Sequence, residues 1–276
     1  MRFDQDYDKA AAYLYDAAER DDVISRYLLG VISHQGLGTR IDLDDASRHF
    51  KIAADNGYGL AQFSLAEMLD KGEGRKPDFI QALRYFQMAA DNGHKLAQFK
   101  TGMFYDIGKH GKQNYATAAR YYTMAAEQGH MPAQFNLAIL YDNGLGVKAD
   151  FELAAELYRL AAEQGHADAQ YALGAMTENG RGVKANLKRA LYYYNLAAEQ
   201  GHVNAQVNLG VVYVKGETDI QDFVKAHMWF NLAAAQGNKT ARDFRDRIAK
   251  QMMPSDISFA QKQARICLEQ NYQKCS

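Results

Sequence analysis

Four histidines recur at a constant spacing of 36 residues, namely His94, His130, His166 and His202. Imidazoles are common metal ligands, but one ligand in each long period does not make a cluster. Packed helices lie roughly 10 Å apart, whereas a metal–nitrogen bond is about 2.1 Å long. The spacing therefore predicts structural histidines at turns and no metal site.

An acidic column keeps the same period, and its members are Asp70, Asp106, Asp142 and Glu178. Paired carboxyl groups roughly 5–10 Å apart could catalyse glycoside hydrolysis, and neighbouring repeats could supply that distance. An acid beside a turn more often accepts local hydrogen bonds or faces water. A hydrolase acting on cell-wall glycans is therefore kept as an alternative function.

The two cysteines, Cys267 and Cys275, stand eight positions apart near the C-terminus. On one straight helix their Cα atoms would be about 12 Å apart, and a disulfide needs less than about 7 Å. A bridge is possible only if the helix ends near Asn271 and the tail folds back. Both the bonded and the free state stay open, and a bond would favour an oxidising compartment.

Composition narrows the class of protein. The 276 residues are 47% hydrophobic and 24% charged, which is typical of a globular chain with a core. A net charge of −1 argues against nucleic-acid binding. No apolar run reaches the roughly 18 residues of a membrane span, so membrane insertion is not expected.

Further columns repeat with the same 36-residue step, which indicates a tandem repeat. They comprise Gly57, Gly93, Gly129, Gly165, Gly201 and Gly237; Gln62, Gln98, Gln134, Gln170 and Gln206; and Ala46, Ala82, Ala118, Ala154, Ala190 and Ala226. Bulky aromatic residues form one more column, consisting of Phe50, Phe86, Tyr122, Tyr158, Tyr194 and Phe230. Independent columns in one register are not expected by chance.

Residues 131–166 illustrate the repeating unit. Apolar residues between Ala133 and Asn143 fall on one face of a helix, and the following glycines break that helix. Asp150 is a suitable N-cap for a second helix that runs to about Gln164. Each unit is therefore predicted to be a pair of antiparallel helices.

One such pair cannot bury its apolar face alone, but stacked pairs can. The predicted fold is all-α, a right-handed α-solenoid, or superhelix, of six antiparallel helix-pair repeats with helical caps. Residues 1–22 form an N-terminal capping helix, residues 23–238 the six repeats, and residues 239–276 the C-terminal capping helices. The first of those C-terminal helices is expected to run from Lys239 to Met252, and the next to begin at Pro254.

The segments 133–138 (AQFNLA), 141–147 (YDNGLGV) and 161–166 (AAEQGH) resemble the Sel-one-like (SLR) repeat of the tetratricopeptide-like superfamily. The resemblance covers residues 23–238 and implies a non-enzymatic, commonly bacterial adaptor in signalling, envelope or host-interaction complexes. Two turns depart from the motif, Gly108–Lys112 and Gly216–Asp219. A cysteine-rich branch of the family is linked to β-lactam binding. Because this chain has no cysteine in its repeats, β-lactam hydrolysis stays only an alternative.

Specificity is expected from the columns that vary between repeats on the first helices, which should line the concave face. Residues at spacings i, i+3 and i+7 share that face. The predicted partner-binding residues are Val31, Lys100, Met103, Ile107, Asn136, Ile139, Asn143, Asn179, Asn208, Val211 and Lys215. Apolar members would anchor an extended peptide and amides would bond its backbone. The alternative is that this face packs against itself across the superhelix.

The sequence thus predicts a non-catalytic scaffold, or adaptor, that binds a protein or peptide in a concave groove. No cofactor, metal or nucleic acid is expected, and the chain is expected to be a monomer with weak self-association possible. A self-assembling structural element is a second alternative. Periplasmic or secreted localisation is slightly favoured if a signal peptide was removed, and a cytoplasmic one otherwise, because the opening residues contain no apolar h-region.

Overall fold

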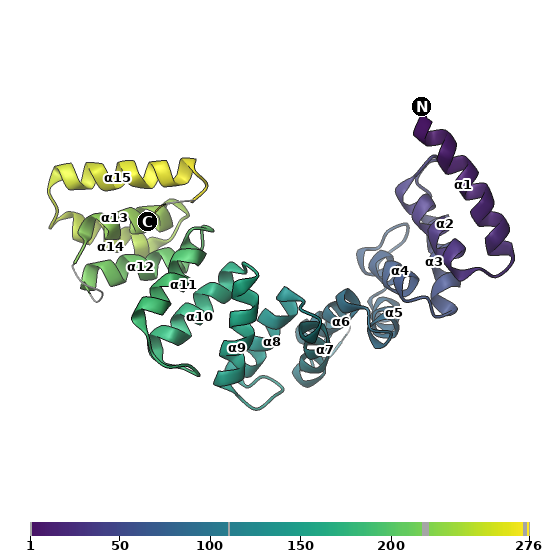
Figure 1. The fold of residues 1–276 in the computed structure, drawn as a ribbon, viewed down its shortest axis with the longest axis horizontal. Coiled ribbons are helices and arrows are strands. Elements are labelled where there is room, and N and C mark those ends of the chain that lie inside the picture. Colours follow the sequence, from purple (N-terminus) through teal and green to yellow (C-terminus); the bar gives the residue numbers. More distant parts are fainter. Residues whose placement is uncertain (1, 110, 217–220, 273–274, 276) are drawn as a thin grey trace. The chain divides into compact units, whose positions relative to one another are not determined.

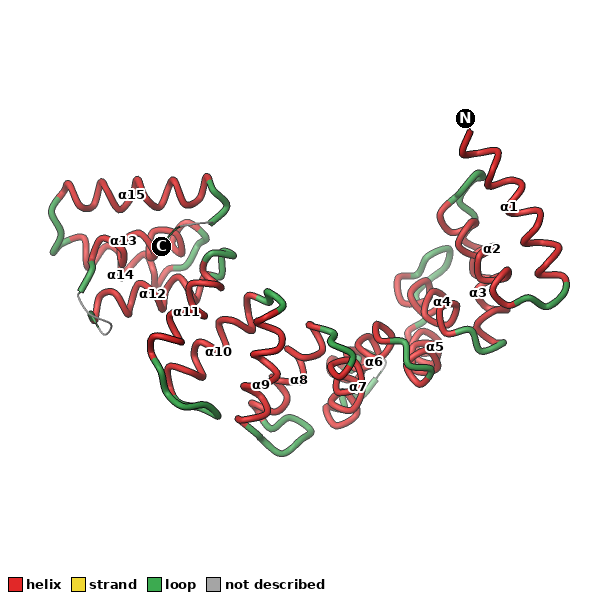
Figure 2. Tube along the Cα trace, in the orientation of Figure 1, coloured by secondary structure: helices red, strands yellow, loops and turns green. Residues whose placement is uncertain are grey.

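Helices and short connections make up the computed structural model (Figure 1), which describes residues 2–109, 111–216, 221–272 and 275. Fifteen helices and no strand occur in these residues (Figure 2). His110 and residues 217–219, which belong to the two departing turns, and residue 220 lie outside the described residues. An all-α architecture is confirmed.

The six pairs predicted from the repeat are all present. Their first helices are α2 (Val23–Gln35), α4 (Gly59–Lys71), α6 (Lys95–Ile107), α8 (Met131–Asn143), α10 (Ala167–Asn179) and α12 (Val203–Lys215). Their second helices are α3 (Leu43–Asp55), α5 (Phe79–Asp91), α7 (Tyr115–Glu127), α9 (Phe151–Glu163), α11 (Leu187–Ala198) and α13 (Phe223–Ala235). The flanking helices are α1 (Arg2–Glu19), α14 (Lys239–Ala249) and α15 (Pro254–Glu269).

The chain divides into two compact units, each with its own buried core. The first unit comprises Met1–Ala133 with Leu145–Val147, and the second comprises Gln134–Gly144 with Lys148–Ser276. Phe86 and Tyr121 are among the large buried side chains of the first unit, and Tyr194 and Trp229 are among those of the second. Consecutive helices pack against one another from α1 to α7 in the first unit and from α9 to α14 in the second.

Capping residues set the helix boundaries. Asp150 precedes α9 with extended backbone, and its carboxylate accepts a 2.9 Å hydrogen bond from the Leu153 amide. This confirms the predicted N-cap. The other second helices are capped in the same way, by Asp42, Asp78, Asn114, Asn186 and Asp222. The first helices end on a left-handed glycine, such as Gly72 (φ 73°), because a side chain would be strained there.

Small residues of the first helices lie against the aromatic column of the second helices. A Cβ atom built on Gly102 would come within 2.6 Å of the Tyr122 ring. A Cβ atom added to Gly30, Gly174 or Gly210 would likewise come within 2.5–2.7 Å of an aromatic ring. The rings are those of Phe50, Tyr194 and Phe230, respectively. Absence of a side chain on the first helix therefore permits this close packing.

A buried glutamine ladder explains the glutamine column. The Gln98 side chain donates a 3.1 Å hydrogen bond to the Ala90 carbonyl and accepts a 2.7 Å bond from the Gln128 Nε2. The same bond to the end of the preceding second helix is made by Gln62, Gln170 and Gln206, so each of these glutamines joins that helix end to the end of the next second helix. Further links of this kind are Asn92 to Gln62, Gln164 to Gln134, Gln200 to Gln170, and Gln236 to Gln206.

The helix predicted for Lys239–Met252 is shorter in the structure, because α14 ends at Ala249. The Gln251 and Met252 amides bond to carbonyls only three residues back, at 2.8 and 3.3 Å, so the last turn tightens. Met253 is extended (ψ 147°), as expected for a residue before proline. The following helix, α15, begins at Pro254 as predicted and packs on α13 (Figure 1).

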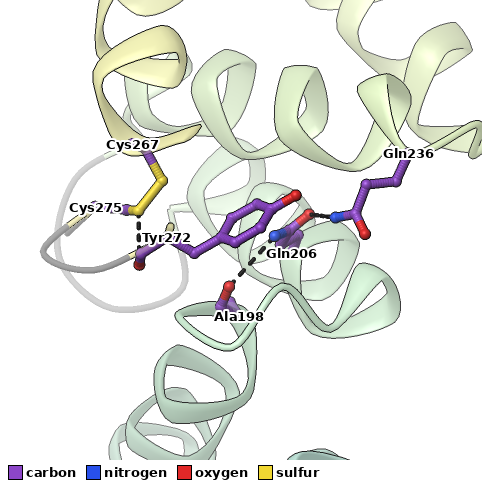
Figure 3. The surroundings of a disulfide bond; sticks show 6 residues. All are labelled: Ala198, Gln206, Gln236, Cys267, Tyr272 and Cys275. Atoms are coloured by element: carbon purple, nitrogen blue, oxygen red, sulfur yellow. Dashed lines mark hydrogen bonds between the residues drawn. A yellow bond between two sulfur atoms is a disulfide. The ribbon is translucent and has the colours of Figure 1, made fainter. Parts of the chain in front are cut away.

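The tail after α15 reverses direction. Asn271 and Tyr272 have left-handed backbone, with φ of 51° and 64°. The reversal brings the Cα atoms of Cys267 and Cys275 to 5.1 Å, and the two residues form a disulfide in the structure (Figure 3). The Tyr272 ring then lies over Gly201, within 3.1 Å of an added Cβ. The bonded tail thereby covers the turn between α11 and α12.

Candidate functional site

The predicted partner-binding residues of the first unit lie on α2 and α6. Val31, Lys100 and Met103 are half-buried, and Ile107 is 62% exposed. Lys100 bonds to Glu67 of the preceding first helix at 3.0 Å, and Lys71 approaches the same carboxyl group at 3.0 Å. Burial alone would raise the pKa of Glu67, but the hydrogen bonds from the two lysines outweigh it and lower that pKa.

The predicted residues of the second unit lie on α8, α10 and α12. Asn136, Ile139, Asn208 and Val211 are half-buried there, whereas Asn143, Asn179 and Lys215 are exposed. Two of these amides donate within their own helices, from Asn143 to the Ile139 carbonyl and from Asn179 to the Ala175 carbonyl, both at 2.8 Å.

Asn208 has a partner among the core tyrosines. Burial raises the pKa of both Tyr171 and Tyr194, and hydrogen bonding to the Asn208 side chain opposes that rise. The tyrosines recur in aromatic columns, but the asparagine varies from repeat to repeat. The sequence pattern therefore indicated the position of Asn208 on the surface and gave no sign of this contact.

Two pockets occupy the same repeat register, one in each unit. The pocket between α2 and α4 has a volume of about 260 Å³, and the pocket between α12 and α14 about 200 Å³. Residues five repeats apart take equivalent places in them. The pairs are Val31 and Val211, His34 and Val214, Gln35 and Lys215, Phe50 and Phe230, Ser64 and Phe244, Glu67 and Arg247, and Met68 and Ile248.

The periodic histidines are N-caps of first helices. His94 Nδ1 accepts a 3.2 Å hydrogen bond from the Ala97 amide, and its ring lies 4.5 Å from the Phe63 ring centre. His130, His166 and His202 repeat this arrangement with Ala133, Ala169 and Ala205. The predicted structural role is confirmed, and no group of three or more possible metal ligands occurs in the described parts of the chain.

Burial shifts these histidines toward the neutral form. It lowers the pKa of His94, His130 and His202, because a charged imidazole is poorly solvated between the helix end and the aromatic ring. Neutral imidazole is also the form that the cap requires, since Nδ1 must keep a lone pair to accept a hydrogen bond.

The acidic column is engaged by neighbouring side chains. Asp106 accepts a 2.9 Å hydrogen bond from the Tyr122 hydroxyl, and Glu178 accepts one of 2.6 Å from Tyr194. In the same column Asp70 forms an ion pair with Lys109, and Asp142 forms one with Arg181 at 3.1 Å. The prediction that these acids make local hydrogen bonds is confirmed for Asp106 and Glu178.

These features define a class, the tandem-repeat proteins built from antiparallel helix pairs. The family model described as the Sel1 repeat matches residues 3–22, 23–58, 59–94, 95–130, 132–166, 167–202 and 203–238. The chain belongs to the Sel1-repeat family, as the sequence resemblance indicated. The fold of this family typically serves as a protein-interaction scaffold. Residues 3–22 give a shorter match than the others, in the region of α1.

Two solved bacterial structures are similar to the chain. One is the Escherichia coli protein c5321, described as a protective antigen of uropathogenic strains with an SLR fold, at 27% identity and a TM-score of 0.64. That match covers 96% of this chain and 65% of c5321, so the chain spans about two thirds of that protein's length. The other is a Sel1 repeat protein from Oxalobacter formigenes, at 28% identity and a TM-score of 0.63, covering 81% and 94% of the two chains. No curated protein matches the chain.

Proposed function

We propose that this protein is a non-catalytic scaffold that binds a protein or an extended peptide on the exposed face of its first helices. The observation that carries the proposal is the difference between the repeating and the varying columns. The repeating alanine, glutamine and aromatic columns are buried. The varying columns, which include Met103, Ile139 and Val211, are half-buried and reach the surface. Accessible apolar side chains of this kind occur in both compact units, and they are suited to contact a partner protein.

The hydrogen bonds and ion pairs of the acidic column support a scaffold function over a hydrolase function. A general acid or base must reach the substrate proton. Asp106 and Glu178 instead accept hydrogen bonds from core tyrosines, while Asp142 is paired with Arg181. These carboxyl groups hold one helix of a pair to the other or one repeat to the next. Their positions therefore have a structural explanation that needs no reaction.

The relatives support a bacterial setting for the partner. The description of the E. coli relative as a protective antigen favours, for this chain, complexes at the envelope or toward a host. No helix in the described ranges has the length and apolar character needed to cross a membrane. We infer that the scaffold meets its partner through a surface of the repeats.

Site-specific photo-crosslinking in the source bacterium tests the proposal. Ile107 on α6 is 62% exposed and Ile80 on α5 is 75% exposed, so the two isoleucines compare a first with a second helix in one unit. We expect benzoylphenylalanine at position 107 to capture a partner and the same group at position 80 to capture none. Equal capture at both positions, or capture only at position 80, would contradict the proposal. A product containing two copies of this chain would instead indicate self-assembly.

A further inference from the structure

The pocket between α12 and α14 is lined mainly by apolar side chains. Phe230, only 1% exposed, belongs to α13, and Val211 reaches the pocket from α12. Phe244 and Ile248 line it from α14. Its counterpart between α2 and α4 has Ser64 in the place of Phe244 and is more polar. The pocket of the second unit is therefore the better anchor for an apolar group.

The size of this pocket limits what it can hold. Its volume of about 200 Å³ is below the roughly 300–1,000 Å³ of typical small-molecule and cofactor sites. A single leucine-sized or phenylalanine-sized side chain is a suitable occupant. Extended peptides are recognised in this way, by pockets that accept individual side chains.

Two cationic residues accompany the apolar lining. Lys215 and Arg247 both line the pocket, and the Arg247 guanidinium lies 5.6 Å from the centre of the Phe244 ring. Arginine presents a planar set of donors that matches a carboxylate. Among the described residues, Asp246, an acid next to Arg247 on α14, forms an ion pair with Arg245 at 2.8 Å and not with Arg247. At the place of Arg247 the other pocket has Glu67, so the two pockets differ in charge as well as in polarity.

We propose that this pocket is the anchor subsite of the scaffold, and that it takes one apolar side chain of a partner peptide with a carboxylate beside it in the same peptide. Phe230 and the α12 and α14 walls bury the apolar group, and Arg247 binds the neighbouring carboxylate. The inference rests on the proposed function and names the chemistry of its partner.

Synthetic peptides supply the test with the full chain. The probe is a labelled nine-residue Gly/Ser peptide with a central Glu-Leu-Glu, and its matched versions carry Glu-Ser-Glu or Lys-Leu-Lys. Fluorescence anisotropy up to millimolar protein should show at least tenfold tighter binding of Glu-Leu-Glu than of either matched peptide. Equal affinities, or no binding of Glu-Leu-Glu, would overturn the inference.

Variants then locate the bound peptide. Arg247→Glu should weaken Glu-Leu-Glu binding at least tenfold, whereas Arg242→Glu, on the same helix but outside the pocket lining, should not. Val211→Trp should also weaken it, and Ile80→Trp, at an exposed position on α5 outside the pocket lining, should leave it unchanged. Peptide binding that survives both Arg247→Glu and Val211→Trp would overturn the inference. If position 107 still captures a partner in that case, the proposed function stands while the anchor subsite fails.

Discussion

The hydroxyl group of Tyr194 donates a 2.6 Å hydrogen bond to Glu178, from the second helix of a repeat to the first. Burial, and then this bond, raise the pKa of the tyrosine. The pair shows how a column of acids that resembles catalytic machinery in the sequence serves to hold a helix pair together. It also provides a direct test of that structural role.

Replacing Tyr194 by Phe should destabilise the protein by about 1.5–3 kcal/mol, because a hydrogen bond to a charged group is lost. Phenylalanine fits the space, since Phe230 occupies the same column one repeat later. Tyr158→Phe is the matched control: that tyrosine is also buried in the column, and the described residues give its hydroxyl no hydrogen bond. Urea unfolding measures both. Equal losses would contradict a specific role for the Glu178 bond.

Gly102→Ala tests the close packing of first helices on aromatic rings. The added methyl group would meet the Tyr122 ring at 2.6 Å, so we expect a loss of roughly 1–3 kcal/mol from overpacking. Gly59→Ala is the control, because its nearest atom outside the local chain is 3.8 Å away. That substitution should be neutral or stabilise by up to about 1 kcal/mol. A neutral Gly102→Ala would show that the ring has room to move.

Stability should fall as pH falls below neutrality. Burial lowers the pKa of His94, His130 and His202 in the folded state, so the unfolded chain binds protons more readily. The stability they contribute is complete above the ordinary histidine pKa of about 6.5 and is lost as pH drops through the lower folded values. Urea unfolding at pH 7.5 and 5.5 measures the difference.

His94→Asn should reduce this pH dependence while keeping the cap. Asn238 stands at the equivalent register and caps α14, accepting a 2.8 Å hydrogen bond from the Ala241 amide. The asparagine side chain does not titrate in this range. An unchanged difference in stability between pH 7.5 and 5.5 would show that the pH dependence arises elsewhere.

Reduction of the Cys267–Cys275 disulfide should destabilise the C-terminal region. Removing a cross-link that closes an eight-residue separation costs about 2.5 kcal/mol by chain entropy. Tyr272 would then be free to leave the α11–α12 turn, and hydrogen exchange of α15 should quicken. The Cys267→Ser/Cys275→Ser double variant should exchange at the reduced rate with or without reductant. Identical exchange of oxidised and reduced wild-type protein would contradict a stabilising bond.

The repeat period predicted most of the fold because each column has one physical cause. The capping role of Asp150 and the boundaries of α9 depend on residues that are adjacent in the sequence, so they can be predicted from it. The helix predicted to end at Met252 ends three residues earlier. The tight turn before Pro254 is formed by backbone hydrogen bonds, which no side-chain pattern predicts.

Contacts between repeats were harder to predict than helices. The glutamine column was evident, but its partner Gln128 could be identified only when the helix ends were placed in space. Likewise, the fit of Gly102 to the Tyr122 ring needs the distance between two helices, which sequence spacing alone does not supply. The binding residues are surface residues without periodic identity, so their role stays a prediction.

The most direct test of the scaffold is the affinity of a partner captured by the full chain, measured for a matched pair of variants. Ile107→Asp places a charge on a first helix, and Ile80→Asp places the same charge on a second helix of the same unit. Both positions are exposed, so neither change should unfold the protein. We predict at least tenfold weaker binding for Ile107→Asp and wild-type binding for Ile80→Asp. Wild-type affinity of Ile107→Asp, whatever the effect of Ile80→Asp, would contradict the account.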